Sequence, residues 1–231
     1  MRTLGLIGGM TWHSTADYYR LINTGVQERL GGSHSADLLL LSIDFEPIED
    51  MQGRGDWPGM GKLMSEWARR LEAAGAEGLV ICANTMHRLA DDVARKVKIP
   101  ILHIADATAG AIKKKGLATV GLLGTRYTME LDFYRGRLEK AHGLKVIIPE
   151  EPGRTAVHDI IYKELAQGIV REESRQAYVA VIRELERRGA QGVILGCTEI
   201  PLLIKAADSP IPVFDTTALH AAAAVEFALS R

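Results

Sequence analysis

Short apolar runs alternate with longer amphipathic stretches along the chain, and this alternation predicts parallel β-sheets covered by helices. Most of the short runs are apolar at consecutive positions, which is typical of strands buried on both faces. Eight runs predict strands: Thr3–Gly8, Ala36–Ile43, Gly78–Cys82, Ile101–Ile104, Ala118–Gly124, Leu144–Ile148, Val193–Gly196 and Ile211–Phe214. The stretches between them predict helices, among them Ser14–Leu30, Gly61–Ala74, Asp106–Lys115, Arg171–Arg188 and Thr216–Leu229.

The second half of the chain repeats the first. Gly75–Thr85 reads GAEGLVICANT and Gly189–Glu199 reads GAQGVILGCTE. Thr3–Gly8 likewise resembles Thr119–Gly124. We therefore expect an α/β fold of two pseudo-symmetric domains, each a small, mainly parallel four-stranded sheet flanked by helices.

The repeat also predicts where the domains divide. Residues 1–98 together with 210–231 are expected to form the first domain, with the C-terminal helix returning to it, and residues 99–209 the second. In open parallel sheets ligands bind outside the carboxyl ends of the strands. Two such edges that faced each other would enclose a small polar molecule, so the active site is expected between the domains.

Composition narrows the class of protein. The 231 residues are 47% hydrophobic, and 28 Lys and Arg stand against 29 Asp and Glu, so no net field favours nucleic acid or an anionic membrane as a partner. No stretch approaches the ~18 apolar residues of a membrane span. Two cysteines do not make a disulfide framework, which favours a reducing compartment and predicts a cytoplasmic protein.

Unusual residues gather where the predicted strands end. Hydroxyl groups follow several strands, in Gly8–Trp12, Ala83–His87, Gly124–Thr128 and Cys197–Glu199. Each hydroxyl taken alone is equally typical of a helix N-cap, but their number favours recognition of an anion. The first glycine loop lacks the spacing of a dinucleotide fingerprint, and we expect its backbone amides to be free to hold a carboxylate.

The two cysteines lie in different local surroundings, and the repeat does not align them with each other. Cys82 lies on an apolar strand and is expected to be a buried, inert thiol. Cys197 ends a strand just before a helix, where amide dipoles can lower the pKa of a thiol. In the register of the repeat, Cys197 aligns with Ala83 and Cys82 aligns with Gly196. No group of cysteines and histidines has zinc-site spacing, so no metal is predicted.

These motifs carry a family resemblance. Ala83-Asn84-Thr85-Met86-His87, Gly196-Cys197-Thr198-Glu199 and Gly5-Leu6-Ile7-Gly8-Gly9-Met10 look like the aspartate/glutamate racemase superfamily, over essentially the whole chain. Two segments, Gly8–Thr15 (GGMTWHST) and Asn84–His87 (NTMH), resemble the broad-specificity bacterial branch. The resemblance implies a small acidic amino acid, aspartate or glutamate, as substrate. It also implies no cofactor, no pyridoxal phosphate, no metal, and a homodimer.

Racemisation needs acid/base groups on both faces of a planar carbanion, and a duplicated scaffold supplies two equivalent positions. The resemblance assigns these positions to Cys197 and residue 83, with His87 and Glu199 as supporting residues. It implies substrate-binding roles for one further set: Met10, Asn84, Thr85, Thr125, Tyr127, Thr128 and Thr198. Gln52 and Arg54, after the second predicted strand, are candidates for the distal carboxylate.

Ala83 departs from the family pattern, in which cysteine or threonine stands at this position. Alanine has no proton to give, so a mechanism with two thiols cannot be written. Residue 83 could be an engineered change, Cys82 could take over by a small shift, or the protein could be a natural enzyme with one base. Adjacent strand residues point to opposite faces, which argues against Cys82.

The alternatives in function follow from the same departure. One is a decarboxylase or isomerase of the same superfamily that works with one cysteine. The other is a catalytically silent protein that binds small dicarboxylates. Racemisation of acidic amino acids, impaired by Ala83, is the function we expect.

Overall fold

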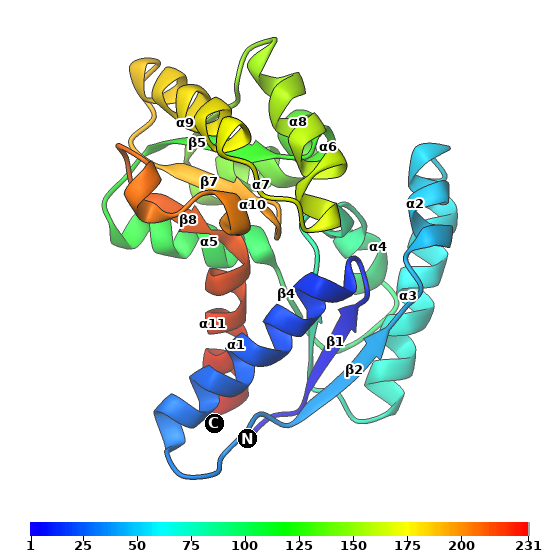
Figure 1. Ribbon diagram of the computed structural model, residues 1–231. Helices are drawn as coiled ribbons and strands as arrows, with labels where there is room; N and C mark the ends of the chain where they lie inside the picture. Colours follow the sequence, from blue (N-terminus) through cyan, green and yellow to red (C-terminus); the bar gives the residue numbers. More distant parts are fainter. Residues whose placement is uncertain (231) are drawn as a thin grey trace. The chain divides into compact units, whose positions relative to one another are not determined.

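The computed structural model describes residues 1–230, and within them two four-stranded sheets form, each of them parallel throughout (Figure 1). The strand orders are β2-β1-β3-β4 and β6-β5-β7-β8, so the two sheets share one topology. The strands are β1 (Leu4–Gly8), β2 (Leu38–Ser42), β3 (Gly78–Ile81), β4 (Ile101–Leu102), β5 (Thr119–Gly124), β6 (Lys145–Ile147), β7 (Val193–Gly196) and β8 (Val213–Asp215). The predicted α/β fold class is confirmed.

Helices flank both sheets. The α-helices are α1 (Trp12–Leu30), α2 (Glu46–Gly53), α3 (Trp57–Ala73), α4 (Ala90–Ala94), α5 (Ile104–Lys114), α6 (Arg126–Glu130), α7 (Asp132–His142), α8 (Gly153–Lys163), α9 (Glu172–Arg187), α10 (Ile200–Leu203) and α11 (Thr216–Leu229). Short 3₁₀ turns are η1 (Thr85–Leu89), η2 (Leu165–Gln167) and η3 (Ala206–Asp208). The five helices named from the sequence correspond to α1, α3, α5, α9 and α11. No helix within residues 1–230 is long and apolar enough to cross a membrane.

The chain forms two compact units. The first comprises Met1–His103 and the chain from His220 onward, and the second comprises Ile104–Leu219. The boundaries expected at 98/99 and 209/210 would place β4 in the second domain and β8 in the first. In the structure β4 pairs with β3 and β8 pairs with β7, because the chain changes units only after completing the fourth strand of each sheet.

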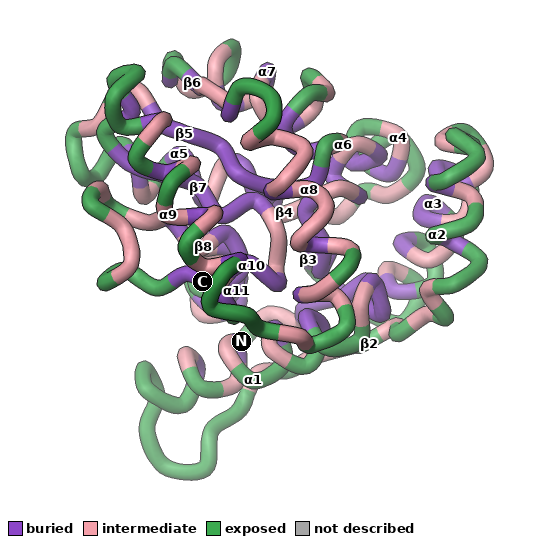
Figure 2. Tube along the Cα trace, turned by 45° about the horizontal axis from the view of Figure 1, so that its top comes forward, coloured by how far each residue is buried: buried purple, intermediate pink, exposed green. Residues whose placement is uncertain are grey.

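Both faces of the first sheet are covered, because successive side chains of a strand point to opposite faces. Ile7 and Ile81 pack in the cluster that includes α3, whereas Leu6 and Val80 pack in the cluster that includes α1 and α11. The second sheet is covered in the same way by α8 and α9 on one face and by α5 and α7 on the other. The central strands β5 and β7 are accordingly buried along their length (Figure 2).

Helix α3 illustrates how the sequence sets these elements. Asp56 caps its first turn by accepting a hydrogen bond from the Gly59 amide at 2.9 Å, a contact typically worth about 1 kcal/mol. Met60, Met64 and Ala68 recur every fourth residue and are all buried, which gives the helix one apolar face toward the sheet.

Candidate active site

The first unit gathers its predicted site residues at the carboxyl edge of its sheet. Ile7 of β1 lies beside Ile81 of β3, so the loop after each strand leaves the sheet at the same edge. Met10 and Ala83, from these two loops, are buried in one apolar cluster. Asn84 is 4% exposed, and Thr85 is partly exposed at the start of η1.

The glycine loop after β1 is tightly packed. Gly9 has a φ of +96°, and a Cβ atom built on it would lie 2.3 Å from the carbonyl oxygen of Ile43, so only glycine fits. The Gly9 amide donates to Oγ1 of Thr15 at 2.7 Å. We expected the amides of this loop to be free for a carboxylate, and for Gly9 that expectation is wrong because the threonine hydroxyl already takes it.

Cys82 and Ala83 point to opposite faces of the first sheet. Cys82 is fully buried against α1 and α11, whereas Ala83 packs in the cluster of α3. Burial also raises the pKa of the Cys82 thiol. Cys82 is therefore buried, as the sequence predicted, and a small shift would not bring it to the position of Ala83.

His87 lies behind Ala83 and is held by the main chain. Its Nδ1 atom is 2.8 Å from the carbonyl oxygen of Ala83, and since a carbonyl only accepts, Nδ1 carries the proton. The ring contacts those of His103 and His220, with centroids 4.6 and 5.4 Å away. Burial and these two neighbours lower the pKa of His87 well below its ordinary value, so the ring is neutral at neutral pH.

Two histidines that the sequence did not single out complete this buried group. His220 of α11 is fully buried, and the hydroxyl of Tyr18 donates to its Nδ1 at 2.8 Å. His220 Nε2 in turn donates to the carbonyl oxygen of Leu102 at 2.6 Å. A histidine inside the alanine-rich run of α11 was the available signal, since such a residue needs a polar partner when buried.

Gln52 and Arg54 lie at the end of α2 in different surroundings. Gln52 is 6% exposed, whereas the Arg54 side chain is 67% exposed and lies 4.0 Å from the carboxylate of Asp50. An arginine this exposed has the reach to move toward a ligand. Its role with a distal carboxylate stays a prediction.

The second unit repeats the arrangement. Gly124 of β5 pairs with Gly196 of β7, so Thr125 and Cys197 follow neighbouring strands at one edge. Thr125 accepts a hydrogen bond from the amide of Thr128 at 3.3 Å and therefore caps α6. Thr128 is fully buried behind it, with the two hydroxyl oxygens 3.3 Å apart, and Tyr127 is partly exposed.

Cys197 forms a hydrogen-bonded pair with Glu199. The thiol donates to Oε2 of Glu199 over 2.9 Å, and the hydroxyl of Thr198 donates to the same oxygen at 2.7 Å. Burial, and then the negative charge of Glu199, raise the pKa of Cys197 well above its ordinary value. The lowered pKa expected from helix dipoles is wrong, because burial and then the adjacent carboxylate outweigh the partial charge of a helix end.

Position 83 and position 197 are structurally equivalent. Ile7 pairs with Ile81 in the first sheet, and Leu123 pairs with Leu195 in the second. Ala83 and Cys197 each follow by two residues, and each packs on the same side of its own sheet, toward α3 and α9 respectively. Within residues 1–230, no three His, Cys, Asp or Glu side chains are grouped as metal ligands.

Fold and site together define a duplicated α/β protein with an acid–base pair at the strand end of one unit. The sequence profile of the Asp/Glu/Hydantoin racemase family matches residues 7–224, and the chain belongs to this family.

Relatives match over nearly their whole length. A candidate Asp/Glu racemase from Yersinia pestis is 56% identical, with both chains covered completely and a TM-score of 0.95. An aspartate racemase homologue from Pyrococcus horikoshii OT3 is 38% identical, also with both chains covered completely, with a TM-score of 0.87. The broad specificity amino-acid racemase RacX of Bacillus subtilis is 24% identical over 96% of each chain.

Proposed function

We propose that the protein catalyses cofactor-independent racemisation of acidic amino acids, aspartate or glutamate, by proton transfer at Cα through Cys197. The observation that carries the proposal is the contact of 2.9 Å between the Cys197 thiol and the Glu199 carboxylate. Membership of the racemase family and the racemases among its relatives support the same reaction.

The pair accounts for both directions of proton transfer. With a raised pKa, Cys197 rests as a thiol and is ready to protonate a carbanion at Cα. To act as a base it first passes its proton to Glu199, and the resulting thiolate then takes the proton of Cα. Glu199 thus stores the proton that the thiol releases, and the hydroxyl of Thr198 holds the carboxylate in place.

Carbanion charge must be spread into the α-carboxylate, because no electron-sink cofactor is part of the proposal. Groups at the two strand edges are our candidates to bind the substrate: Met10, Gln52, Arg54, Asn84, Thr85, Thr125, Tyr127, Thr128 and Thr198. His87, neutral and fixed to the Ala83 carbonyl, positions the main chain of the first edge.

Ala83 makes this an asymmetric enzyme. The equivalent of Cys197 in the first unit is a methyl group, so the repeat supplies no second side-chain acid. We therefore expect fast exchange of the Cα proton on one face and slow inversion.

Exchange in heavy water tests the proposal. Each enantiomer of aspartate and glutamate is incubated with the enzyme, deuterium at Cα is measured by mass spectrometry, and inversion is measured by chiral chromatography. We expect deuterium in one enantiomer ahead of inversion. Cys197→Ala should abolish exchange, whereas Cys82→Ala, which removes the buried thiol, should retain it. Equal exchange in Cys197→Ala would refute the role of the thiol.

Ala83 also favours a second candidate, a protein that binds small dicarboxylates without turning them over. Calorimetry with the same four amino acids separates the two, since saturable binding without any exchange supports the second candidate. We further propose a cytoplasmic homodimer, by family resemblance. Sedimentation velocity of the purified protein tests the dimer.

A further inference from the structure

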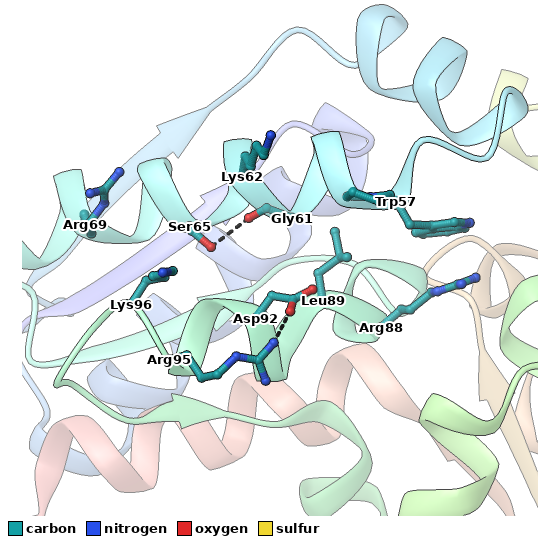
Figure 3. A pocket seen from close by; sticks show the side chains of 11 residues that line it. Trp57, Gly61, Lys62, Ser65, Arg69, Arg88, Leu89, Asp92, Arg95 and Lys96 are labelled. Carbon is teal, nitrogen blue, oxygen red and sulfur yellow. Dashed lines mark hydrogen bonds and ion pairs between the residues drawn. The ribbon is translucent and has the colours of Figure 1, made fainter.

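A basic groove lies in the first unit between α3 and the segment formed by η1 and α4 (Figure 3). Its volume is about 750 Å³, within the range of sites for small molecules. Its lining includes five basic side chains and one aromatic one: Lys62, Arg69, Arg88, Arg95, Lys96 and Trp57. None of these residues belongs to the proposed racemase site.

Most of the positive charge in the groove is not neutralised by the protein. Arg95 pairs with Asp92, the acidic residue of the lining. Lys62, Arg69 and Lys96 make no ion pair with any side chain of the described chain, residues 1–230. The whole protein carries a net charge of only −1. A local excess of positive charge on a nearly neutral chain favours an anionic ligand.

The two ends of the groove differ. Trp57 and Arg88 lie at one end, where the guanidinium of Arg88 is 4.0 Å from the centre of the indole ring. Arg69 and Lys96 lie at the other end, and Lys62 and Ser65 lie between (Figure 3). Trp57 and Arg69 are twelve residues apart on α3, which corresponds to about 18 Å along the helix axis.

The difference between the aromatic end and the basic end indicates the class of ligand. A flat heterocycle stacks on an indole or guanidinium plane, and phosphate oxygens bind arginine and lysine. Trp57 and Arg88 are both partly buried, and this burial lowers the pKa of Arg88. A single small anion would contact only one end, whereas an extended anion with a ring at one terminus uses both.

We propose that this groove binds a nucleoside polyphosphate, with its base at Trp57 and Arg88 and its phosphates along Lys62, Arg69 and Lys96. The site is separate from the proposed racemase site and does not depend on the proposed function. Gly61 and Ser65 also line the groove. Gly61 packs closely against Asp92 and Leu89, and the Ser65 hydroxyl donates to the Gly61 carbonyl at 2.7 Å.

Calorimetry at low ionic strength tests the proposal with ATP, ADP and inorganic triphosphate as probes. ATP should bind saturably and more tightly than ADP, because it carries more charge. Inorganic triphosphate should bind at least about tenfold more weakly than ATP, because it lacks the base. Raising the salt concentration should weaken all three.

Substitutions test which part of the ligand each end of the groove binds. The double variant Arg69→Ala/Lys96→Ala should lose at least about tenfold in affinity for ATP. Trp57→Leu, which keeps an apolar side chain at the start of α3, should bring the affinity for ATP down to that for triphosphate. The matched control is Lys113→Ala/Lys114→Ala, which removes two exposed lysines from the end of α5 in the other unit.

Four outcomes overturn the proposal. The first three are no saturable binding of ATP, equal binding of ATP and triphosphate, and equal affinity for ATP in the groove and control variants. The fourth is a change in sedimentation of Arg69→Ala/Lys96→Ala with unchanged affinity for ATP, which would make the groove an interface between copies of the chain. Each of these measurements can also be made with the Cys197→Ala protein, so the test of the groove does not depend on the racemase proposal.

Discussion

Acidification should destabilise the first unit through protonation of His220. Burial lowers the pKa of this histidine from its ordinary 6.5 to about 4. The folded unit therefore keeps His220 neutral down to about pH 4, whereas the unfolded chain takes up a proton as the pH falls through 6.5. The unfolded state binds the extra proton within this window, so the free energy of unfolding falls as the pH is lowered from 6.5 to 4.

The size of the effect follows from the shift. One unit of pKa corresponds to about 1.4 kcal/mol, so His220 should account for a loss of about 3 kcal/mol between pH 7 and pH 4. A protonated His220 would keep its donor bond to the Leu102 carbonyl, but its Nδ1 could then only donate, so the Tyr18 hydroxyl would have to change from donor to acceptor in that bond.

Urea unfolding followed by tryptophan fluorescence measures this unit selectively, because Trp12, Trp57 and Trp67 all lie in it. His220→Gln should be less stable at pH 7, but its stability should fall by about 3 kcal/mol less than that of the parent protein on going to pH 4.

The carboxylates are present in both proteins, so their contributions cancel in the comparison. His87 loses the effect of His220 in the variant but keeps burial, the largest cause of its lowered pKa. His34→Gln, which removes an exposed histidine of the same unit, is the control and should follow the parent. Equal losses in His220→Gln and the parent would refute the reasoning.

Three further substitutions test other contacts. Glu199→Gln should lower the pKa of Cys197 by removing the adjacent charge, which the pH profile of iodoacetamide alkylation would show as faster reaction at neutral pH; an unchanged profile would exclude the coupling. Gly124→Ala should destabilise the second unit by about 2 kcal/mol in urea unfolding followed by circular dichroism, because its Cβ would lie 2.8 Å from a main-chain oxygen of β7. Asp106→Asn should cost about 1 kcal/mol in the same assay, since it breaks a half-exposed bidentate pair with Arg137 at 2.7 Å, and no loss would mean that solvent screens the pair fully.

The fold could be predicted because it depends on patterns that are local in sequence. Apolar runs such as Val193–Gly196 identified buried strands, and the repeat indicated that four of them form each unit. Short elements such as α2, α4 and α6 were not named, because five to eight residues are too few to show a helical period.

The chemistry of the site was less predictable, because it depends on which atoms meet. Placing Cys197 at a strand end was correct, but the sequence did not show that Glu199 turns back onto its thiol. Nor did it show that the Thr15 hydroxyl accepts a hydrogen bond from the Gly9 amide. The basic groove could not be predicted for the same reason, since its cations come from α3 and from residues 88–96, and only the fold brings these two segments together.

Restoring a thiol at position 83 should produce a pair with unequal pKa values. The backbone offers two equivalent positions, but the repeat aligns Glu199 with Thr85, so a thiol at residue 83 would have no carboxylate in the corresponding place. Without that negative charge, its pKa should lie below that of Cys197.

Ala83→Cys should then supply one thiol suited to act as a base and one suited to act as an acid, the pair that racemisation requires. We expect inversion of aspartate or glutamate to rise by at least about tenfold over the parent, with the thiol of residue 83 alkylated at lower pH than Cys197. Ala83→Ser, of similar size but without an acidic thiol, should gain much less. If alkylation shows a reactive thiol at residue 83 and inversion does not rise, the missing thiol is not what limits inversion, and the racemase proposal is refuted.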